Sequence, residues 1–371
     1  MLLFTPGPTP VPEAVRQAMA TPTLHHRTPE FEAIFAKARE GLFALMGTDE
    51  VVMLASTGTG AMEAAITNLC HSALLNVNAG KFGERFGKIA RAHGLGNVEI
   101  THEWDTPATP EEVVDALRAR PDIDAVAVQI SESAGGLRHP VEAIAKAVKA
   151  ERPDVTVIAD GITAVGVEPI DTTHIDALIA GSQKALMLPP GLAVIGLSQA
   201  AVEKIGEGKG FYFNLASEIK KQRQNTTAYT AATTLVSGLV AMFDAIEKQG
   251  GLDKLYADTA KRAEAVRAAL EALGLHIYPK APARSMTTVD DAQAKEIRDL
   301  LKTRYGVNVA GGQDHLKGKI FRINQMGLIA PYEMAWVLNA VELALDSLGR
   351  RSYDGAANRV FNEVYFGLKE G

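Results

Sequence analysis

From about Val51 onward, short apolar runs alternate with amphipathic helical stretches, and this alternation constrains the fold more than any other feature of the chain. A repeating succession of strand and helix is typical of α/β proteins with a largely parallel sheet. Several runs are apolar throughout rather than at every second residue, as expected for strands with helices on both faces. The predicted strands of this region are VVMLA, LLNVN, AVAVQI, VTVIAD, DALIAG and LAVIGL.

The pattern changes after a helical region that runs from about Leu235 to Leu273 and is weakened at Gly250 and Gly251. Beyond it, strand-like runs are interleaved with two helices, which indicates a small α+β domain. The helices are expected at about 291–305 and 332–348, and the strands in LHIY, MTTV, GVNVA and KIFRI.

These patterns predict a large domain over residues 16–245 and a small C-terminal domain over residues 246–371. The first fifteen residues are dense in proline and glycine, which disfavours regular secondary structure. We therefore expect residues 1–15 to form an N-terminal arm that lies on another surface.

Composition excludes several classes of function. The formal net charge is only −6 and the basic residues are scattered among acids, so no nucleic-acid-binding stripe is expected. No apolar run approaches the roughly 20 residues of a membrane-spanning helix, and early prolines interrupt any secretory signal, so a cytoplasmic protein is expected. Cys70 is the only cysteine, which excludes an internal disulfide or a cysteine-based metal cluster within one chain. We expect small molecules as partners and no metal.

Four polar features follow predicted strands. They are Ser56–Gly60 after VVMLA, Ser131–Ser133 after AVAVQ, Asp160 after VTVIA and Ser182–Lys184 after ALIAG. In open α/β sheets, ligands bind outside the carboxyl ends of the strands. We therefore expect these groups to converge on one ligand.

The segment STGTGAMEAA leaves a strand and enters a helix, so it offers backbone N–H groups, hydroxyls and a positive helix end to an anion such as phosphate. It lacks the lysine of a P-loop, and Glu63 stands where a dinucleotide fingerprint has its third glycine. Taken alone, the segment is equally consistent with a glycine-rich turn that has a threonine cap.

Two charged residues stand in apolar surroundings. Asp160 ends a continuous apolar strand, where a carboxylate needs a cationic or N–H partner. A pyridinium nitrogen is one such partner, and a helix cap or strand-end turn is the alternative. Lys184 lies between an apolar strand and the run ALMLPPG. Most lysines are solvated, but a desolvated lysine here is a nucleophilic amine of the kind that Schiff-base enzymes use.

Arg322 lies in the strand-like run KIFRIN, where alternation places it on the face opposite Phe321 and Ile323. The pattern leaves two interpretations open. The guanidinium is either solvated, or it faces a cleft between domains and binds a substrate carboxylate in a bidentate pair.

These residues, in this order, resemble the class V aminotransferases of the pyridoxal-phosphate superfamily, especially the alanine–glyoxylate and serine–pyruvate branch. The resemblance spans nearly the whole chain, and GSQKALMLPPG is its strongest motif. The other matching segments are FTPGPTPVPEAV, HRTPEFE, STGTGAMEAA, NAGKFGER, ISESAGG, IADGITAVG and GVNVAGGQDHLKGKIFRI.

The resemblance implies a role for each matching residue. Lys184 would form a Schiff base with pyridoxal 5'-phosphate, and Asp160 would bind its pyridine nitrogen as the second catalytic residue. Arg322 would bind the α-carboxylate of the substrate, with Gly7 also at the substrate site. The cofactor-binding set would be Thr57, Gly58 and Thr59 at the phosphate, Phe82 and Ile162 on the two ring faces, Ser133 and Gln183 beside the ring, Asp160, Lys184, and Tyr229 and Thr230 from the neighbouring subunit.

The match is weaker in two places. Some relatives carry a tyrosine three residues before the matched threonine Thr230, but here that position is Thr227 and the tyrosine is Tyr229. Related sequences often have a histidine in the turn after the arginine strand, where this chain has Asn324 and Gln325. These departures affect the phosphate site and the choice of substrate.

The resemblance implies a fold-type I enzyme, with a large domain, a small C-terminal domain, and a homodimer that shares its active sites. Its expected reaction is transamination between a small amino acid, such as alanine or serine, and a 2-oxo acid, such as glyoxylate or pyruvate. One arginine accounts for one carboxylate, which favours these donors over aspartate, although His25, His26 and Arg27 offer a further cation.

Other activities remain alternatives. An aspartate aminotransferase or another class V pyridoxal-phosphate enzyme such as a lyase is the nearest. A cysteine desulfurase needs a mobile cysteine, a role that does not suit Cys70 because it lies in the helix after the phosphate loop. A nicotinamide-dependent oxidoreductase is disfavoured by the missing third glycine.

Overall fold

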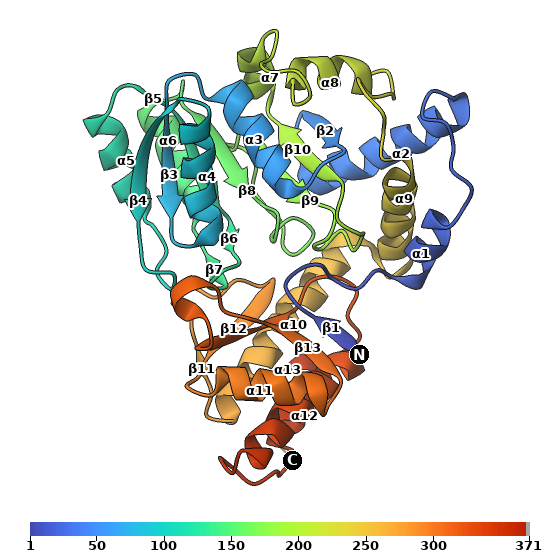
Figure 1. The fold of residues 1–371 in the computed structure, drawn as a ribbon, viewed down its shortest axis with the longest axis vertical. Helices are drawn as coiled ribbons and strands as arrows, with labels where there is room; N and C mark the ends of the chain where they lie inside the picture. Colours follow the sequence, from blue (N-terminus) through green and yellow to red (C-terminus); the bar gives the residue numbers. More distant parts are fainter. Residues whose placement is uncertain (369–371) are drawn as a thin grey trace.

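A seven-stranded sheet forms the centre of the larger domain in the computed structural model, which describes residues 1–368 (Figure 1). The strand order is β2-β10-β9-β8-β5-β3-β4, in which β10 runs antiparallel to both neighbours and the other pairs are parallel. The mostly parallel sheet is therefore confirmed. Its strands are β2 (Glu50–Leu54), β3 (Ala73–Asn78), β4 (Gly96–Thr101), β5 (Ile123–Gln129), β8 (Thr156–Asp160), β9 (Ala177–Gly181) and β10 (Ala193–Leu197).

Helices cover both faces of this sheet, which explains why its central strands are apolar at successive positions. In β2, Val51 and Met53 belong to one core, and Val52 and Leu54 belong to the other. The first core includes residues of α1 (Glu13–Met19), α2 (Pro29–Met46), α5 (Pro110–Ala119), α6 (Val141–Glu151) and α9 (Thr233–Lys248), and the second includes residues of α3 (Gly58–Leu69), α4 (Lys81–Ala92), α7 (Gln199–Ile205) and α8 (Leu215–Gln222).

The smaller domain has a five-stranded sheet of order β1-β13-β14-β12-β11 and a hydrophobic core of its own, in the lower part of Figure 1. This confirms the expected small α+β domain. No helix in the described part of the chain is long and apolar enough to cross a membrane. The elements are β1 (Leu2–Phe4), β11 (His276–Ile277), β12 (Met286–Asp290), β13 (Val307–Gly311), β14 (Ile320–Asn324), α10 (Gly251–Ala272), α11 (Ala294–Thr303), the short helix η1 (Asp314–Leu316), α12 (Pro331–Ser347) and α13 (Ala356–Phe366).

The helical region between the domains is two helices rather than one. Helix α9 ends at Lys248 and α10 begins at Gly251. Gly250 and Gly251 have φ angles of 106° and 82°, a conformation that interrupts a helix and that glycine adopts readily. The division of the chain at residue 246 stays a prediction, as does the extent of the N-terminal arm.

The N-terminal segment differs from the expectation that its first fifteen residues form no regular element. Leu2–Phe4 pairs in parallel with Val307–Val309, and Phe4 is buried in the core of the smaller domain. Helix α1 then begins at Glu13. The expectation was wrong here because the prolines begin only at Pro6, so the apolar residues before them are free to join a sheet whose partner strand lies far along the sequence.

Candidate active site

The predicted polar features gather at one edge of the larger sheet. Asp160 ends β8, Ser131–Ser133 follows β5, and Lys184 follows β9, and these three strands are parallel neighbours in the sheet. The loop that begins at Thr57 follows β2, and a Cβ atom at Gly58 would lie only 2.3 Å from Cδ1 of Ile162. The loop after β2 and the residues after β8 are therefore in direct contact, as the strand-end argument predicted.

The N-terminal arm holds the lysine. Lys184 Nζ donates a hydrogen bond of 2.6 Å to the carbonyl of Pro6. Thr9 binds the backbone on both sides of this contact: its N–H donates to the carbonyl oxygen of Gln183 at 3.0 Å, and its hydroxyl donates to the carbonyl oxygen of Lys184 at 2.7 Å. A Cβ atom at Gly7, whose φ is +128°, would lie 2.3 Å from Lys184 Nζ, so glycine allows the arm to approach this closely. Sequence reasoning missed Pro6 and Thr9.

The lysine and the aspartate have pKa values shifted toward neutrality. Burial, together with the positive charge of Arg322, lowers the pKa of Lys184 to about 8, and the negative charge of Asp160 opposes this shift. Burial raises the pKa of Asp160 to about 6, against the hydrogen bond that it accepts from the N–H of Ile162 at 2.9 Å and the nearby positive charges of Lys184 and Arg85. Shifts of this kind are typical of groups that exchange protons or bind charged ligands.

A second buried carboxylate, that of Glu132, fixes the start of α4. It accepts hydrogen bonds from the N–H groups of Phe82 at 3.0 Å, Gly83 at 2.9 Å and Ala134 at 2.9 Å. Burial raises the pKa of Glu132 to about 7. The contacts tie Phe82 to the short β6–β7 hairpin (Ser131–Glu132 and Leu137–Arg138). In the sequence, Glu132 is visible as an acidic residue between Ser131 and Ser133, but the sequence alone indicates no role for it.

An arginine that the sequence analysis did not single out lies between two predicted cofactor-binding residues. Arg85 Nη1 donates a hydrogen bond of 2.8 Å to the hydroxyl of Thr59. Its Cζ atom lies 4.7 Å from the centre of the Phe82 ring. The available signal was the spacing of three residues between Phe82 and Arg85, which places both on one side of a helix.

Arg322 is buried, with 7% of its surface exposed, so it is not the solvated residue of the first interpretation. Its Nε and Nη2 donate to the carbonyl of Gly311 at 3.2 and 2.6 Å, and Nη1 donates to the carbonyl of Ser133. A guanidinium has five N–H donors, so one on each terminal nitrogen has no partner among the described residues. Burial lowers the pKa of Arg322 to about 10, and Glu132 opposes that shift.

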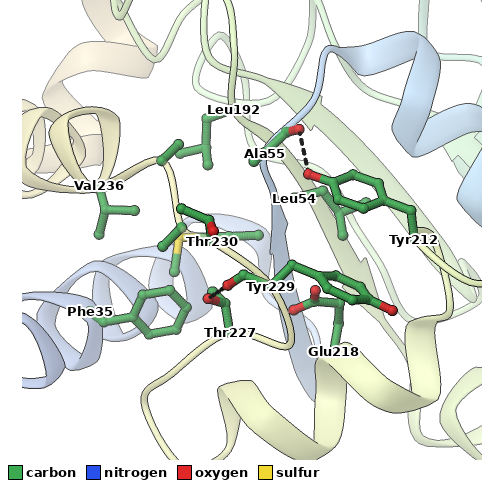
Figure 2. Close-up of a pocket in the computed structure, with 13 residues that line it drawn as sticks. Phe35, Leu54, Ala55, Leu192, Tyr212, Glu218, Thr227, Tyr229, Thr230 and Val236 are labelled. Carbon is green, nitrogen blue, oxygen red and sulfur yellow. Dashed lines mark hydrogen bonds between the residues drawn. The ribbon is translucent and has the colours of Figure 1, made fainter. Parts of the chain in front are cut away.

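Tyr229 and Thr230 line a separate small pocket (Figure 2), whose lining does not include Lys184, Asp160 or Thr57. Tyr229 stacks on Tyr212, with ring centres 5.3 Å apart, and its hydroxyl donates to the carbonyl of Phe211 at 3.0 Å. Thr230 is exposed. Within one chain, the described structure therefore groups these two residues apart from the other predicted site residues.

The site contains unused donors and acceptors. Thr57 begins α3 without a side-chain cap, so its hydroxyl and the first N–H groups of the helix are available to an anion. The buried Oε1 of Gln183 has no hydrogen-bond partner in the described part of the chain. From the residues that the structure describes, the Asp160 carboxylate accepts a single hydrogen bond, which suits a carboxylate that binds a cation.

Comparison with known proteins identifies the family. A family model for aminotransferase class-V matches residues 1–327. The chain belongs to the class V aminotransferases. An uncharacterised aminotransferase of Helicobacter pylori is 53% identical over 369 residues, which cover 99% of this chain and 100% of the relative.

Two further relatives of this class V aminotransferase carry named activities. The serine–glyoxylate aminotransferase of Methylorubrum extorquens is 31% identical over 376 residues, which cover 95% of this chain and 93% of the relative. A solved aspartate aminotransferase of Thermus thermophilus is 31% identical, with a TM-score of 0.85 over 98% of this chain and 100% of that chain. Fold type I and pyridoxal phosphate as the cofactor are thereby confirmed.

The residues of this class V aminotransferase fit pyridoxal phosphate. The open start of α3 suits the phosphate, and the buried carboxylate of Asp160 suits a protonated ring nitrogen. Gly58 and Gly7 leave room where a side chain would collide with Ile162 or Lys184. The nicotinamide-dependent alternative is therefore set aside.

Proposed function

We propose that this class V aminotransferase transfers the amino group of a small amino acid, such as alanine or serine, to a 2-oxo acid such as glyoxylate or pyruvate. The observation that carries the proposal is the buried guanidinium of Arg322, in which one N–H donor on each terminal nitrogen has no partner among residues 1–368. Such a pair matches one carboxylate. The activity named for the Methylorubrum relative supports the acceptor.

Aspartate as the donor is a second candidate, because the Thermus relative is an aspartate aminotransferase. A donor with two carboxylates needs a second cation in the site. The positive charge of Arg85 affects the pKa of both Asp160 and Lys184, so Arg85 is a nearby cation. Its guanidinium, however, already contacts Thr59 and Phe82. This arrangement favours a donor with one carboxylate.

The chain's own groups then have defined tasks. The cofactor supplies an aldehyde that condenses with amines and a ring that withdraws electrons from the α-carbon of the substrate. Lys184 holds the cofactor through Nζ and, when released by the substrate, takes up the proton of the substrate α-carbon. A pKa of about 8 supports this role, because the amine loses its proton much closer to neutral pH than an ordinary lysine does.

The remaining residues bind and orient. Arg322 fixes the substrate α-carboxylate, and Gly7, where a side chain would collide with Lys184 Nζ, borders the substrate site. Asp160 keeps the ring nitrogen protonated. In our proposal Thr57, Gly58 and Thr59 bind the phosphate, Phe82 and Ile162 cover the ring faces, and Ser133 and Gln183 lie beside the ring.

The decisive experiment is a panel of half-reactions, in which the cofactor absorbance is followed after addition of each amino acid in turn. Alanine, serine or glycine should react faster than aspartate, and glyoxylate or pyruvate should restore the starting spectrum. Fastest reaction with aspartate would replace this proposal with the second candidate. An amine that lacks a carboxylate is the matched control, because Arg322→Lys should slow the amino acids and leave this amine nearly unchanged.

We further propose a homodimer in which Tyr229 and Thr230 complete the phosphate site of the partner subunit. Neighbouring aromatic side chains support such a contact, because Phe211 is 79% exposed and Tyr212 is 45% exposed. Co-expression of a Lys184→Ala chain with a Tyr229→Ala/Thr230→Ala chain should restore activity to roughly a quarter of wild type, since about half of the dimers are hybrids with one intact site. Hybrid dimers without activity, confirmed by differential tags, would contradict the shared site.

A further inference from the structure

Arg85 occupies the first turns of α4, three residues after Phe82. Its guanidinium lies over the Phe82 ring, with 4.7 Å between Cζ and the ring centre, and Nη1 donates to Thr59 Oγ1 at 2.8 Å. The guanidinium plane is therefore held by the Phe82 ring, and one of its N–H donors is used by Thr59. A charged side chain held in this way has little freedom to bind another ligand.

The two residues that Arg85 contacts come from different parts of the sheet. Phe82 lies in the first turn of α4, which follows β3, whereas Thr59 lies in the first turn of α3, which follows β2, and four strands separate β2 from β3 in the sheet order. The backbone of Phe82 is fixed separately, because its N–H donates to Glu132. Arg85 is thus a direct side-chain link between the ring side of the proposed cofactor site and its phosphate side.

We propose that Arg85 is a positioning residue, which sets the ring-stacking Phe82 and the phosphate-binding Thr59 at the separation that pyridoxal phosphate requires. The inference rests on the proposed roles of these two residues. Arg85 orients the Thr59 hydroxyl by donating to its oxygen, so the hydroxyl proton of Thr59 is left to donate to the phosphate. Its guanidinium, which lies over the Phe82 ring, holds that ring in place.

The test measures the affinity of the apoenzyme for pyridoxal phosphate and for pyridoxal, which lacks the phosphate. Arg85→Met should raise the Kd for pyridoxal phosphate by about tenfold or more, because a charge-assisted hydrogen bond and a cation–π contact are lost together. The Kd for pyridoxal should rise by only about threefold, through Phe82 alone. Arg91→Met is the matched control: it lies on the same helix, is exposed, and should leave both constants unchanged.

Arg85→Lys separates the two contacts. Its ammonium can still donate to Thr59 but has no flat face for the ring, so both constants should rise together by about threefold and their ratio should stay near wild type. If Arg85→Met does not fold, this variant decides alone. The proposal would be overturned if the Kd for pyridoxal phosphate and the Kd for pyridoxal both stayed within about twofold of wild type in each folded variant.

A double-mutant cycle tests whether Arg85 acts through Thr59. Thr59→Val should raise the Kd for pyridoxal phosphate and leave that for pyridoxal unchanged. In the Arg85→Met background, the same substitution should add less than about threefold, because coupled residues are not additive. Full additivity would overturn the link. An increase in the KM for aspartate with unchanged cofactor affinity would also overturn it, since Arg85 would then bind the substrate.

A separate readout distinguishes failure of this inference from failure of the proposed function. At saturating pyridoxal phosphate, borohydride reduction and peptide mass spectrometry should place the cofactor on Lys184 in wild type and in every Arg85 variant. Labelling elsewhere would overturn the proposed site and the inference together. Labelling at Lys184 with unchanged affinities would overturn only the role of Arg85.

Discussion

Two buried arginines of this enzyme have nearly equal exposure but very different surroundings. Arg262, on α10, donates to the carbonyls of Gln325, Gly327 and Ile329, and also to the hydroxyl of Thr259. Its Nε and Nη1 each donate to one of these groups and its Nη2 to three, so a single N–H, on Nη1, has no partner in the described part of the chain, and the residue pins the turn after β14. Arg322, on β14 itself, donates to two carbonyls, and within the described structure two of its N–H groups, one on each terminal nitrogen, have no partner.

The difference separates a buried charge that holds the fold from one that is kept for a ligand. Removing a partner from a satisfied buried charge, or removing the charge from its partners, costs stability. A buried charge with unused bonding capacity gains its full set of partners only when something binds. Lys184 and Asp160 belong to the second kind, because burial lowers the pKa of the lysine and raises the pKa of the aspartate, and both shifts favour the uncharged form.

The largest expected effect is the loss of activity in Lys184→Ala. The variant should lose covalent attachment of the cofactor and at least about a thousandfold in kcat, because both the anchoring and the proton-transferring amine are removed. Its apoenzyme should be no less stable than wild type in urea, since a poorly solvated amine has been removed. A cofactor that borohydride still fixes to the protein, without added amine, would contradict the assignment of Lys184.

Arg262→Met should show the reverse pattern. It leaves three backbone carbonyls without their donors, so the free energy of unfolding should fall by about 3–5 kcal/mol in denaturant titrations. Activity per folded molecule should change little. Arg16→Met, the same substitution at an exposed position, should change stability by less than about 0.5 kcal/mol. Equal stability of the Arg262 variant and wild type would remove the contrast between the two arginines.

Arg322→Lys tests geometry separately from charge. The ammonium cannot reproduce a planar pair of donors, so transition-state binding should weaken by about 2–4 kcal/mol in kcat/KM with the best amino acid. An amine without a carboxylate should be little affected. A similar loss for both kinds of amine would indicate that Arg322 holds the fold, as Arg262 does.

Asp160→Asn should give the smallest change, a gain in stability of the apoenzyme. Because folding raises the pKa of Asp160 from 3.8 to about 6, the native state binds a proton that the unfolded chain releases between those values. Its contribution to stability is therefore lost as pH rises through that window. The variant should be more stable than wild type by about 1–3 kcal/mol at pH 7.5, and this gain should vanish near pH 4. Lower stability of the variant at pH 7.5 would show that hydrogen bonds and nearby positive charges stabilise the ionised carboxylate by more than its burial costs.

Much of the fold could be predicted from the sequence because strands with helices on both faces of their sheet are apolar throughout. β4 was not predicted, since Gly96–Thr101 alternates polar and apolar residues at the sheet edge and has exposed positions. The positions of Asp160 and Lys184 at one sheet edge followed from the strand pattern. The hydrogen bonds of Thr9 to the backbone of Gln183 and Lys184, and of Arg85 to Thr59, did not, because they join residues far apart in the sequence and leave no periodic signal.

The pairing of Leu2–Phe4 with Val307–Val309 also bears on when this enzyme can form during its synthesis. The first strand leaves the ribosome long before its partner, which follows roughly 300 residues later. At synthesis rates of about 5–20 residues per second the interval is roughly 15 to 60 s. Pro6 and Thr9, which hold Lys184, lie directly behind that strand. The lysine therefore lacks its final surroundings until most of the polypeptide exists, and the nascent chain should acquire the reactive amine only near the end of translation.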